Sequence, residues 1–274
     1  MMTDDYLRRM TMQLLPAKSS TGTQTRAMGR KSASGRPSRA LRLATHPALL
    51  AAVSMAAAAP GLAQIDEDQL GAWYMYFGAG DLGEPGRWGV QVDAQYRNWD
   101  LGGDLEQLLL RGGLTYRPDN IDALFTLGAA HITSGKFGPS DNTLTEKRIY
   151  QEALLARQPG ERVYLRHRFR AEQRWVNGQD ARTRYRYALF MDIPLNGVAL
   201  SPGAVYLALY NEVFINGERD IGGARRVKYF DRNRSYAALG YSLTPSLRIQ
   251  FGLMRQITSS TEKNQWQLSL HHKF

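Results

Sequence analysis

The sequence predicts an all-β fold: a transmembrane antiparallel up-and-down β-barrel that follows a cleaved signal peptide. Two observations lead to this prediction. From residue 70 onward, apolar and polar residues alternate in segments of roughly 9–14 residues, long enough to cross a bilayer as tilted strands. Near the N terminus, a basic stretch followed by an apolar one has the pattern of a secretory leader.

The composition excludes several other classes of protein. The chain has 274 residues, of which 43% are hydrophobic and 10% are aromatic, a content that argues against disorder. A helical membrane protein needs runs of about 20 apolar residues, and the sequence has none. Cysteine is absent, which excludes thiolate catalysis, disulfide frameworks and cysteine-ligated metal sites.

The leader is the first element in chain order. Arg36, Arg39 and Arg42 precede an apolar run over residues 47–59, which is too short to span a bilayer. Small residues follow this run, and they predict cleavage after Ala63.

Cleavage there divides the chain into an N-terminal extension with the signal peptide, residues 1–63, and a barrel domain, residues 64–274. The first part holds nine basic and two acidic residues, which accounts for most of the formal net charge of +10. The charge therefore belongs mainly to the leader, and we expect no nucleic-acid partner.

Alternation identifies the strands of the barrel domain. It is clearest in residues 163–175, where arginines and Glu172 alternate with Val163, Leu165 and Phe169. The next segment places further arginines opposite tyrosine, leucine and isoleucine, and the others alternate in the same way. In chain order the expected strands cover residues 86–99, 107–117, 122–134, 145–157, 163–175, 182–193, 203–216, 229–243, 247–253 and 266–274.

The connections are turn formers of two kinds. Residues 117–120, 158–160 and 244–246 contain proline with small polar residues and predict tight periplasmic turns. Longer polar stretches predict external loops. These cover residues 135–144, 176–181, 217–228 and 258–264.

A soluble β-sandwich is the alternative, because it shares the period of two. Its polar face carries a mixture of solvated charges, whereas rows of arginine dominate the polar face here. Trp and Tyr lie towards the strand ends, as in interfacial girdles. We therefore favour the membrane barrel and expect an apolar set to face lipid: Leu165, Phe169, Leu189, Phe251 and Leu268.

The number of strands is predicted as ten, with twelve left open. Residues 70–78 form an eleventh candidate. Bacterial single-chain barrels have even strand numbers, so we expect this segment to lie outside the ladder or within the lumen.

Several short motifs occur in a defined order and continue to a final strand that ends at Phe274. Together they resemble the domain of unknown function 2490 family, over residues 70–274. The resemblance implies a Gram-negative outer-membrane barrel and no assigned activity. The motifs are Glu146-x-Arg148, residues 166–175, Arg182-x-Arg184-x-Arg186, Glu212-x-Phe214 and Asp231-Arg232-Asn233-Arg234.

The polar face predicts a charge network that lines the lumen. Acidic and basic side chains on neighbouring strands are expected to pair, which favours a structural, salt-bridged interior. The excess of arginine leaves a narrow anion-preferring channel as a second possibility. The expected network contains Glu146, Arg148, Glu152, Arg166, Arg168, Arg170, Glu172, Arg174, Arg182, Arg184, Arg186, Glu212, Arg232 and Arg234.

We expect no enzymatic activity, no cofactor and no metal, because the mature chain offers neither a triad nor metal-ligand spacing. The alternative is an outer-membrane hydrolase with an extracellular-loop site near His131. Expected partners are outer-membrane lipid and lipopolysaccharide. The basic residues 225–228 either meet lipopolysaccharide phosphates or bind nothing in particular. The barrel-assembly machinery is expected to recognise the strand that ends at Phe274.

Overall fold

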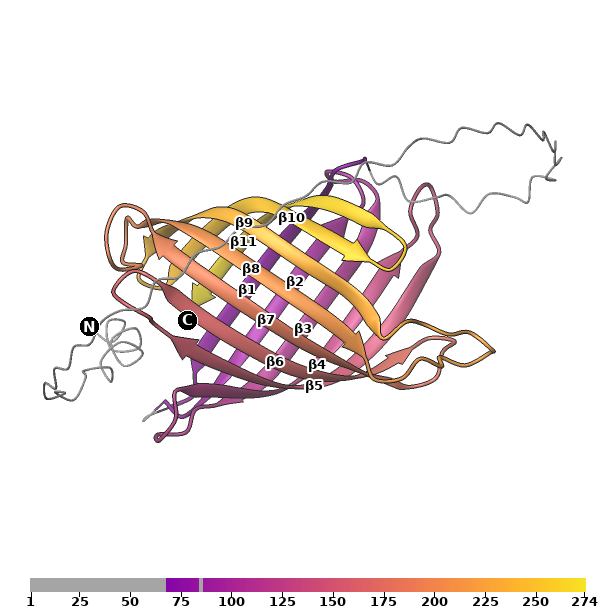
Figure 1. The fold of residues 1–274 in the computed structure, drawn as a ribbon, viewed down its shortest axis with the longest axis horizontal. Helices are drawn as coiled ribbons and strands as arrows, with labels where there is room; N and C mark the ends of the chain where they lie inside the picture. Colours follow the sequence, from indigo (N-terminus) through magenta and orange to yellow (C-terminus); the bar gives the residue numbers. More distant parts are fainter. Residues whose placement is uncertain (1–67, 84–85) are drawn as a thin grey trace, which may run out of the picture. The chain divides into compact units, whose positions relative to one another are not determined.

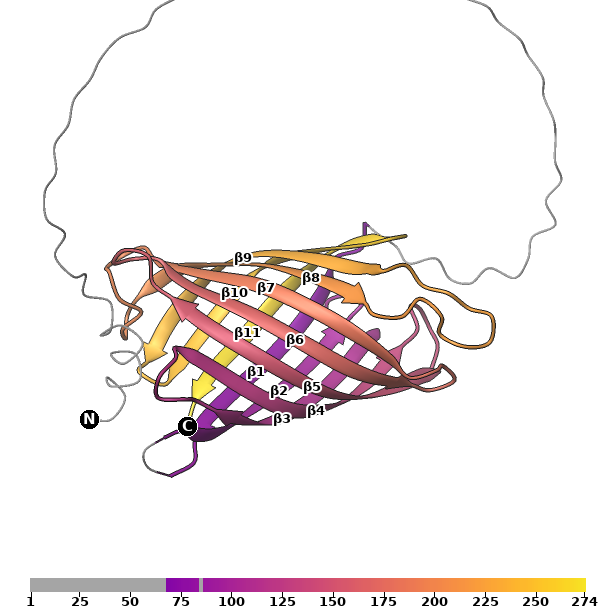
Figure 2. The ribbon, with the colours of Figure 1, turned by 60° about the horizontal axis from the view of Figure 1, so that its bottom comes forward.

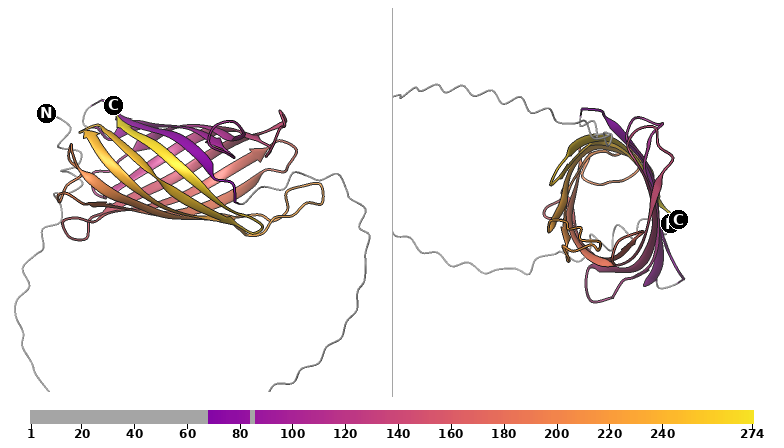
Figure 3. Two further views of the ribbon diagram at one scale, coloured as in Figure 1. Left: turned by 90° about the horizontal axis from the view of Figure 1, so that it is seen from above. Right: turned by 90° about the vertical axis from the view of Figure 1, so that its right-hand side faces the viewer.

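The computed structural model describes residues 68–83 and 86–274, and these residues form one closed β-barrel of eleven strands (Figure 1). The view along the axis in Figure 3 shows the closed ring. The predicted all-β barrel is therefore confirmed. The strands are β1 (Gly71–Asp81), β2 (Trp88–Asn98), β3 (Leu105–Tyr116), β4 (Ala123–Gly135), β5 (Thr143–Arg157), β6 (Tyr164–Val176), β7 (Arg182–Pro194), β8 (Val205–Asn216), β9 (Phe230–Thr244), β10 (Leu247–Thr258) and β11 (Glu262–Lys273).

The described part of the chain contains no helix that is long and apolar enough to cross a membrane. The expected signal peptide, with cleavage after Ala63, lies outside the described residues.

The prediction of ten strands is wrong, because residues 70–78 belong to β1 and β1 is part of the ladder. β1 pairs antiparallel with β2 and parallel with β11, from Gly71 opposite Gln265 to Ala79 opposite Lys273. With an odd number of alternating strands, the first and last run in the same direction and close the barrel as a parallel pair. The expectation of an even number assumed antiparallel closure.

The connections alternate between two ends of the barrel. The Phe274 end carries the C terminus and the connections 82–83 with 86–87, 117–122, 158–163, 195–204 and 245–246. The Arg182 end carries the connections 99–104, 136–142, 177–181, 217–229 and 259–261. Figure 2 shows the long 217–229 connection, in orange, projecting away from the C terminus.

The predicted contrast between short and long connections is weak. The 195–204 connection at the Phe274 end is long, whereas 177–181 and 259–261 at the other end are short. Some strands begin earlier than expected, β11 at Glu262 for example, and so take up residues that were predicted as loop.

The two faces of the wall differ in the way the alternation predicts. Large apolar side chains such as Leu127, Leu239 and Phe251 are exposed on the outer face. Charged and amide side chains fill the interior, together with an apolar cluster that contains Trp73 and Tyr206.

Candidate functional site: a buried arginine and glutamate network

The network lies inside the barrel, mainly on β5 to β9. Because side chains alternate along a strand, the arginines at every second position of β6 all point inward. The register then sets their neighbours: Arg184 lies opposite Glu172, and Arg170 lies opposite Glu152. Opposite charges are thus brought together across adjacent strands.

Glu172 is at the centre of the network, with 1% of its side chain exposed. Its carboxylate accepts hydrogen bonds from Arg184 Nη2 at 2.6 Å and from Arg186 Nη1 at 2.5 Å. Arg148 and Arg170 approach the same carboxylate to 3.9 and 3.7 Å. Two charge-assisted hydrogen bonds from β7 and two longer ion pairs from β5 and β6 converge on this one group, which joins these three adjacent strands.

The other predicted glutamates also join neighbouring strands. Each accepts hydrogen bonds from arginines that are themselves mostly buried, so the cost of removing these charges from water is offset by short ion pairs. The contacts are Glu146 with Arg148 Nε at 2.6 Å and Arg174 Nε at 2.5 Å, Glu152 with Arg170 Nε at 2.6 Å, and Glu212 with Arg168 Nη2 at 2.6 Å and Arg186 Nη2 at 2.7 Å.

Two predicted arginines pair with acids that were not part of the predicted charge network. Arg166 donates to Asp192 at 2.7 Å, and Arg232 contacts Asp231 at 3.2 Å. Asp192 follows the alternation of β7 and was open to prediction. Asp231 was not, because a register shift between β8 and β9 makes it an extra residue that turns inward towards Arg184.

Arg182 and Arg234 remain without a carboxylate. Within the described residues, Arg182 has no side-chain hydrogen bond or ion pair, and its Nε and Nη1 are buried without a partner. Arg234 donates a hydrogen bond to Gln256 at 2.8 Å, and its guanidinium group lies over the ring of Trp73. The guanidinium group of Arg97 lies 3.8 Å from the centre of the same ring. Arg182 and Arg234 therefore carry basic charge in the interior that no carboxylate of the described residues balances within ion-pair distance.

Aromatic side chains close the space between the charged groups. Tyr206, Trp73 and Phe214 are each almost fully buried, and the guanidinium of Arg186 lies 4.4 Å from the centre of the Phe214 ring. Guanidinium groups stack on aromatic faces with little loss of hydrogen bonding. These side chains therefore pack together with little of their surface exposed.

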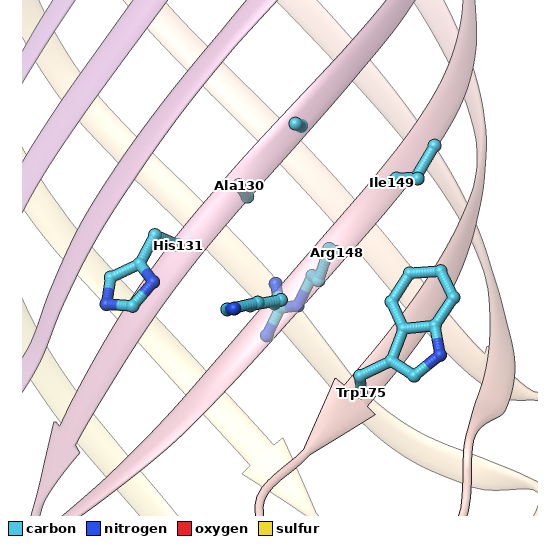
Figure 4. Close-up of a pocket in the computed structure, with 7 residues that line it drawn as sticks. Ala130, His131, Arg148, Ile149 and Trp175 are labelled. Atoms are coloured by element: carbon cyan, nitrogen blue, oxygen red, sulfur yellow. The ribbon is translucent and has the colours of Figure 1, made fainter.

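The residue considered for a hydrolase site lies elsewhere. His131 is within β4, on the exposed outer face, and not in a loop. Figure 4 shows it beside a groove with Ile149 and Trp175. In the described residues, no group of three or more histidine, aspartate or glutamate side chains is arranged to hold a metal ion.

The residues that the structure describes thus define a class of protein: a mostly antiparallel β-barrel closed by a parallel pair and filled by arginine and glutamate pairs. The model of a family described as "Protein of unknown function (DUF2490)" matches residues 70–267, and the chain belongs to this family. The resemblance inferred from the motifs is confirmed. No curated protein and no solved structure matches the chain.

Proposed function

We propose that this protein is a β-barrel of the bacterial outer membrane with a structural role, held closed by its arginine and glutamate pairs. The proposal rests on the distribution of its side chains, which is the inverse of that in a soluble protein: apolar side chains lie outside and charged side chains lie inside. Leu239 and Leu127 are 61% and 60% exposed on the outer face, whereas Glu172 and Arg184 are buried inside. A soluble protein rarely exposes so continuous an apolar surface, but a barrel in lipid requires one.

Aromatic residues near both ends of the strands support the same proposal. Trp88 and Tyr116 contact each other at the Phe274 end, with ring centres 4.8 Å apart, and both lie on the outer face. Trp175 is exposed on β6 near the Arg182 end. Such side chains prefer the level of the lipid headgroups.

Cell fractionation tests this proposal. The protein should sediment with outer membranes, resist extraction by carbonate, and migrate faster on gels before heating than after it. N-terminal sequencing of the mature chain should begin at Gln64, after cleavage at Ala63. Recovery as a soluble periplasmic protein would contradict the proposal.

The proposed partners follow from the same location. We propose that the barrel-assembly machinery recognises β11 and Phe274, whose ring is exposed and whose backbone N–H donates to Ala79 O at 2.9 Å. Deleting Phe274 should reduce the amount of folded protein in the outer membrane. We propose lipopolysaccharide as the partner of exposed Arg226 in the 217–229 connection.

A narrow anion-preferring channel is the second candidate, and the unpaired Arg182 favours it. Recording across planar bilayers separates the two. The structural proposal predicts no steady current from the wild-type protein, because buried arginine, glutamate and aromatic side chains pack the interior. A current with a reversal potential that shows anion preference would support the channel instead.

A further inference from the structure

A groove of about 460 Å³ lies on the outer face of the wall near the Arg182 end. His131 on β4 is directly opposite Lys147 on β5, and Lys147 is directly opposite Trp175 on β6. Figure 4 shows His131 and Trp175 on opposite sides of this groove. The row therefore gathers two groups able to carry positive charge and one indole on three neighbouring strands.

Lys147 differs from the other cations on this face. On the described strands, the outward lysines and arginines are Lys147, Arg157 and Arg255. Arg255 pairs with Glu262 at 2.5 Å, and Arg157 lies 3.9 Å from Asp122. Lys147 has no side-chain hydrogen bond or ion pair within the described residues, so its charge is available to a ligand.

Apart from Arg148, whose side chain belongs to the interior network, the rest of the groove lining is apolar. Ala129 and Ile149 face each other one step further from the Arg182 end, and both are exposed. The small side chain of Ala129 leaves a notch between its larger neighbours. These neighbours line the groove together with the methylene groups of Lys147. An apolar groove that ends at a cation is complementary to a molecule with a hydrocarbon chain and an anionic head.

We propose that this groove binds the lipid A part of lipopolysaccharide, with a lipid A phosphate at Lys147 and His131 and one acyl chain against Ala129 and Ile149. This inference rests on the proposed location in a membrane. Trp175 supports it, because indole rings lie at the headgroup level, where a lipid phosphate would be found. The lysine ammonium has three donors for the phosphate oxygens, and the imidazole supplies another.

Native mass spectrometry of the folded, mature protein tests the proposal, with lipid A as the probe and lipid A without its phosphates for comparison. The wild-type protein should retain the phosphorylated lipid A preferentially. Lys147→Gln should weaken this retention about fivefold, the effect expected for one basic residue near a membrane surface. Ala129→Leu should weaken it as well, because it fills the notch and leaves the charge unchanged.

Arg255→Gln is the matched control, since Arg255 is also an outward cation but is paired with Glu262. It should leave lipid retention unchanged. Excess inorganic phosphate should not displace the lipid; displacement would show that the site takes the free anion and would overturn the proposal. Equal retention by wild type and Lys147→Gln would overturn it as well.

The same preparation separates this inference from the proposed function. Heat-modifiable migration and carbonate-resistant membrane association report on the barrel, independently of any bound lipid. If both are present without lipid preference, only the lipid site fails. If both are absent, the proposed location fails, and the lipid site fails with it.

Discussion

Arg170 on β6 and Arg186 on β7 lie directly opposite each other in the register of the two strands. Like charges at such positions repel, and both side chains are buried. Each guanidinium turns to carboxylates on neighbouring strands: Arg170 to Glu152, and Arg186 to Glu172 and Glu212. The glutamates therefore offset the repulsion between these two buried arginines.

Replacing Glu172 by glutamine tests that dependence. Glu172→Gln keeps the shape but leaves Arg184 and Arg186 short of a counter-charge. Removing one partner of a buried ion pair costs about 3–5 kcal/mol, and we expect the free energy of unfolding to fall by this amount. Urea unfolding in lipid vesicles, followed by tryptophan fluorescence, measures it. The same substitution at exposed Glu161 is the control and should have little effect; an unchanged midpoint for Glu172→Gln would contradict the network's role.

Most of the fold could be predicted from the sequence, because the period of two assigns each side chain to a face without knowledge of its partners. The strand that begins at Gly71 was excluded, since closure depends on how β1 meets β11, two segments at opposite ends of the domain. No local pattern encodes that register. The parallel seam therefore became visible only in the closed barrel.

The candidate site shows the same limit. Alternation places the fourteen predicted residues on the inward face, but the choice of partner depends on how far each strand is offset from the next. The inward turn of Asp231 arises from a register shift that alternation does not reveal. The stacking of Arg97 and Arg234 on Trp73 joins β1, β2 and β9, which are far apart in sequence.

Gly240 on β9 lies directly opposite Tyr206 on β8, and the tyrosine ring occupies the space that a Cβ would need. Gly240→Ala should therefore displace the buried ring and lower the free energy of unfolding by about 1–3 kcal/mol. Gly112→Ala is the control, because a Cβ there meets only Gln91 O at 4.0 Å. Thermal or urea unfolding of both variants decides the matter; equal stability would show that the ring moves without cost.

Asp100 predicts a dependence on pH in the 99–104 connection. Its carboxylate accepts backbone hydrogen bonds from Gly102, Gly103 and Asp104 at 2.9, 2.7 and 3.0 Å. The bond from Gly103 is the largest cause of the lowered pKa of Asp100, followed by those from Asp104 and Gly102. A carboxyl group whose pKa is lower in the folded state stabilises above the unfolded pKa of about 3.9, and this stabilisation is lost as the pH falls through the folded value.

Asp100→Asn should therefore lower the unfolding temperature at neutral pH, and the difference from wild type should shrink as the pH falls below about 4. Thermal unfolding at a series of pH values measures this difference. The exposed Asp141→Asn variant is the control and should show no such trend. A difference that stays constant down to low pH would exclude the charged carboxylate as its source.

Leu239 on β9 provides the sharpest test of the environment outside the barrel. It is the most exposed of the large apolar side chains in the described residues, at 61%. In water, Leu239→Arg should cost little, because the side chain already meets solvent. In lipid it should lower stability by about 2–4 kcal/mol near the middle of the bilayer. Leu195→Arg is matched in chemistry and is 51% exposed, but it lies in the 195–204 connection and should be tolerated in both environments. Unfolding in lipid vesicles that leaves Leu239→Arg as stable as Leu195→Arg would place the outer face in water and end the proposal of a membrane barrel.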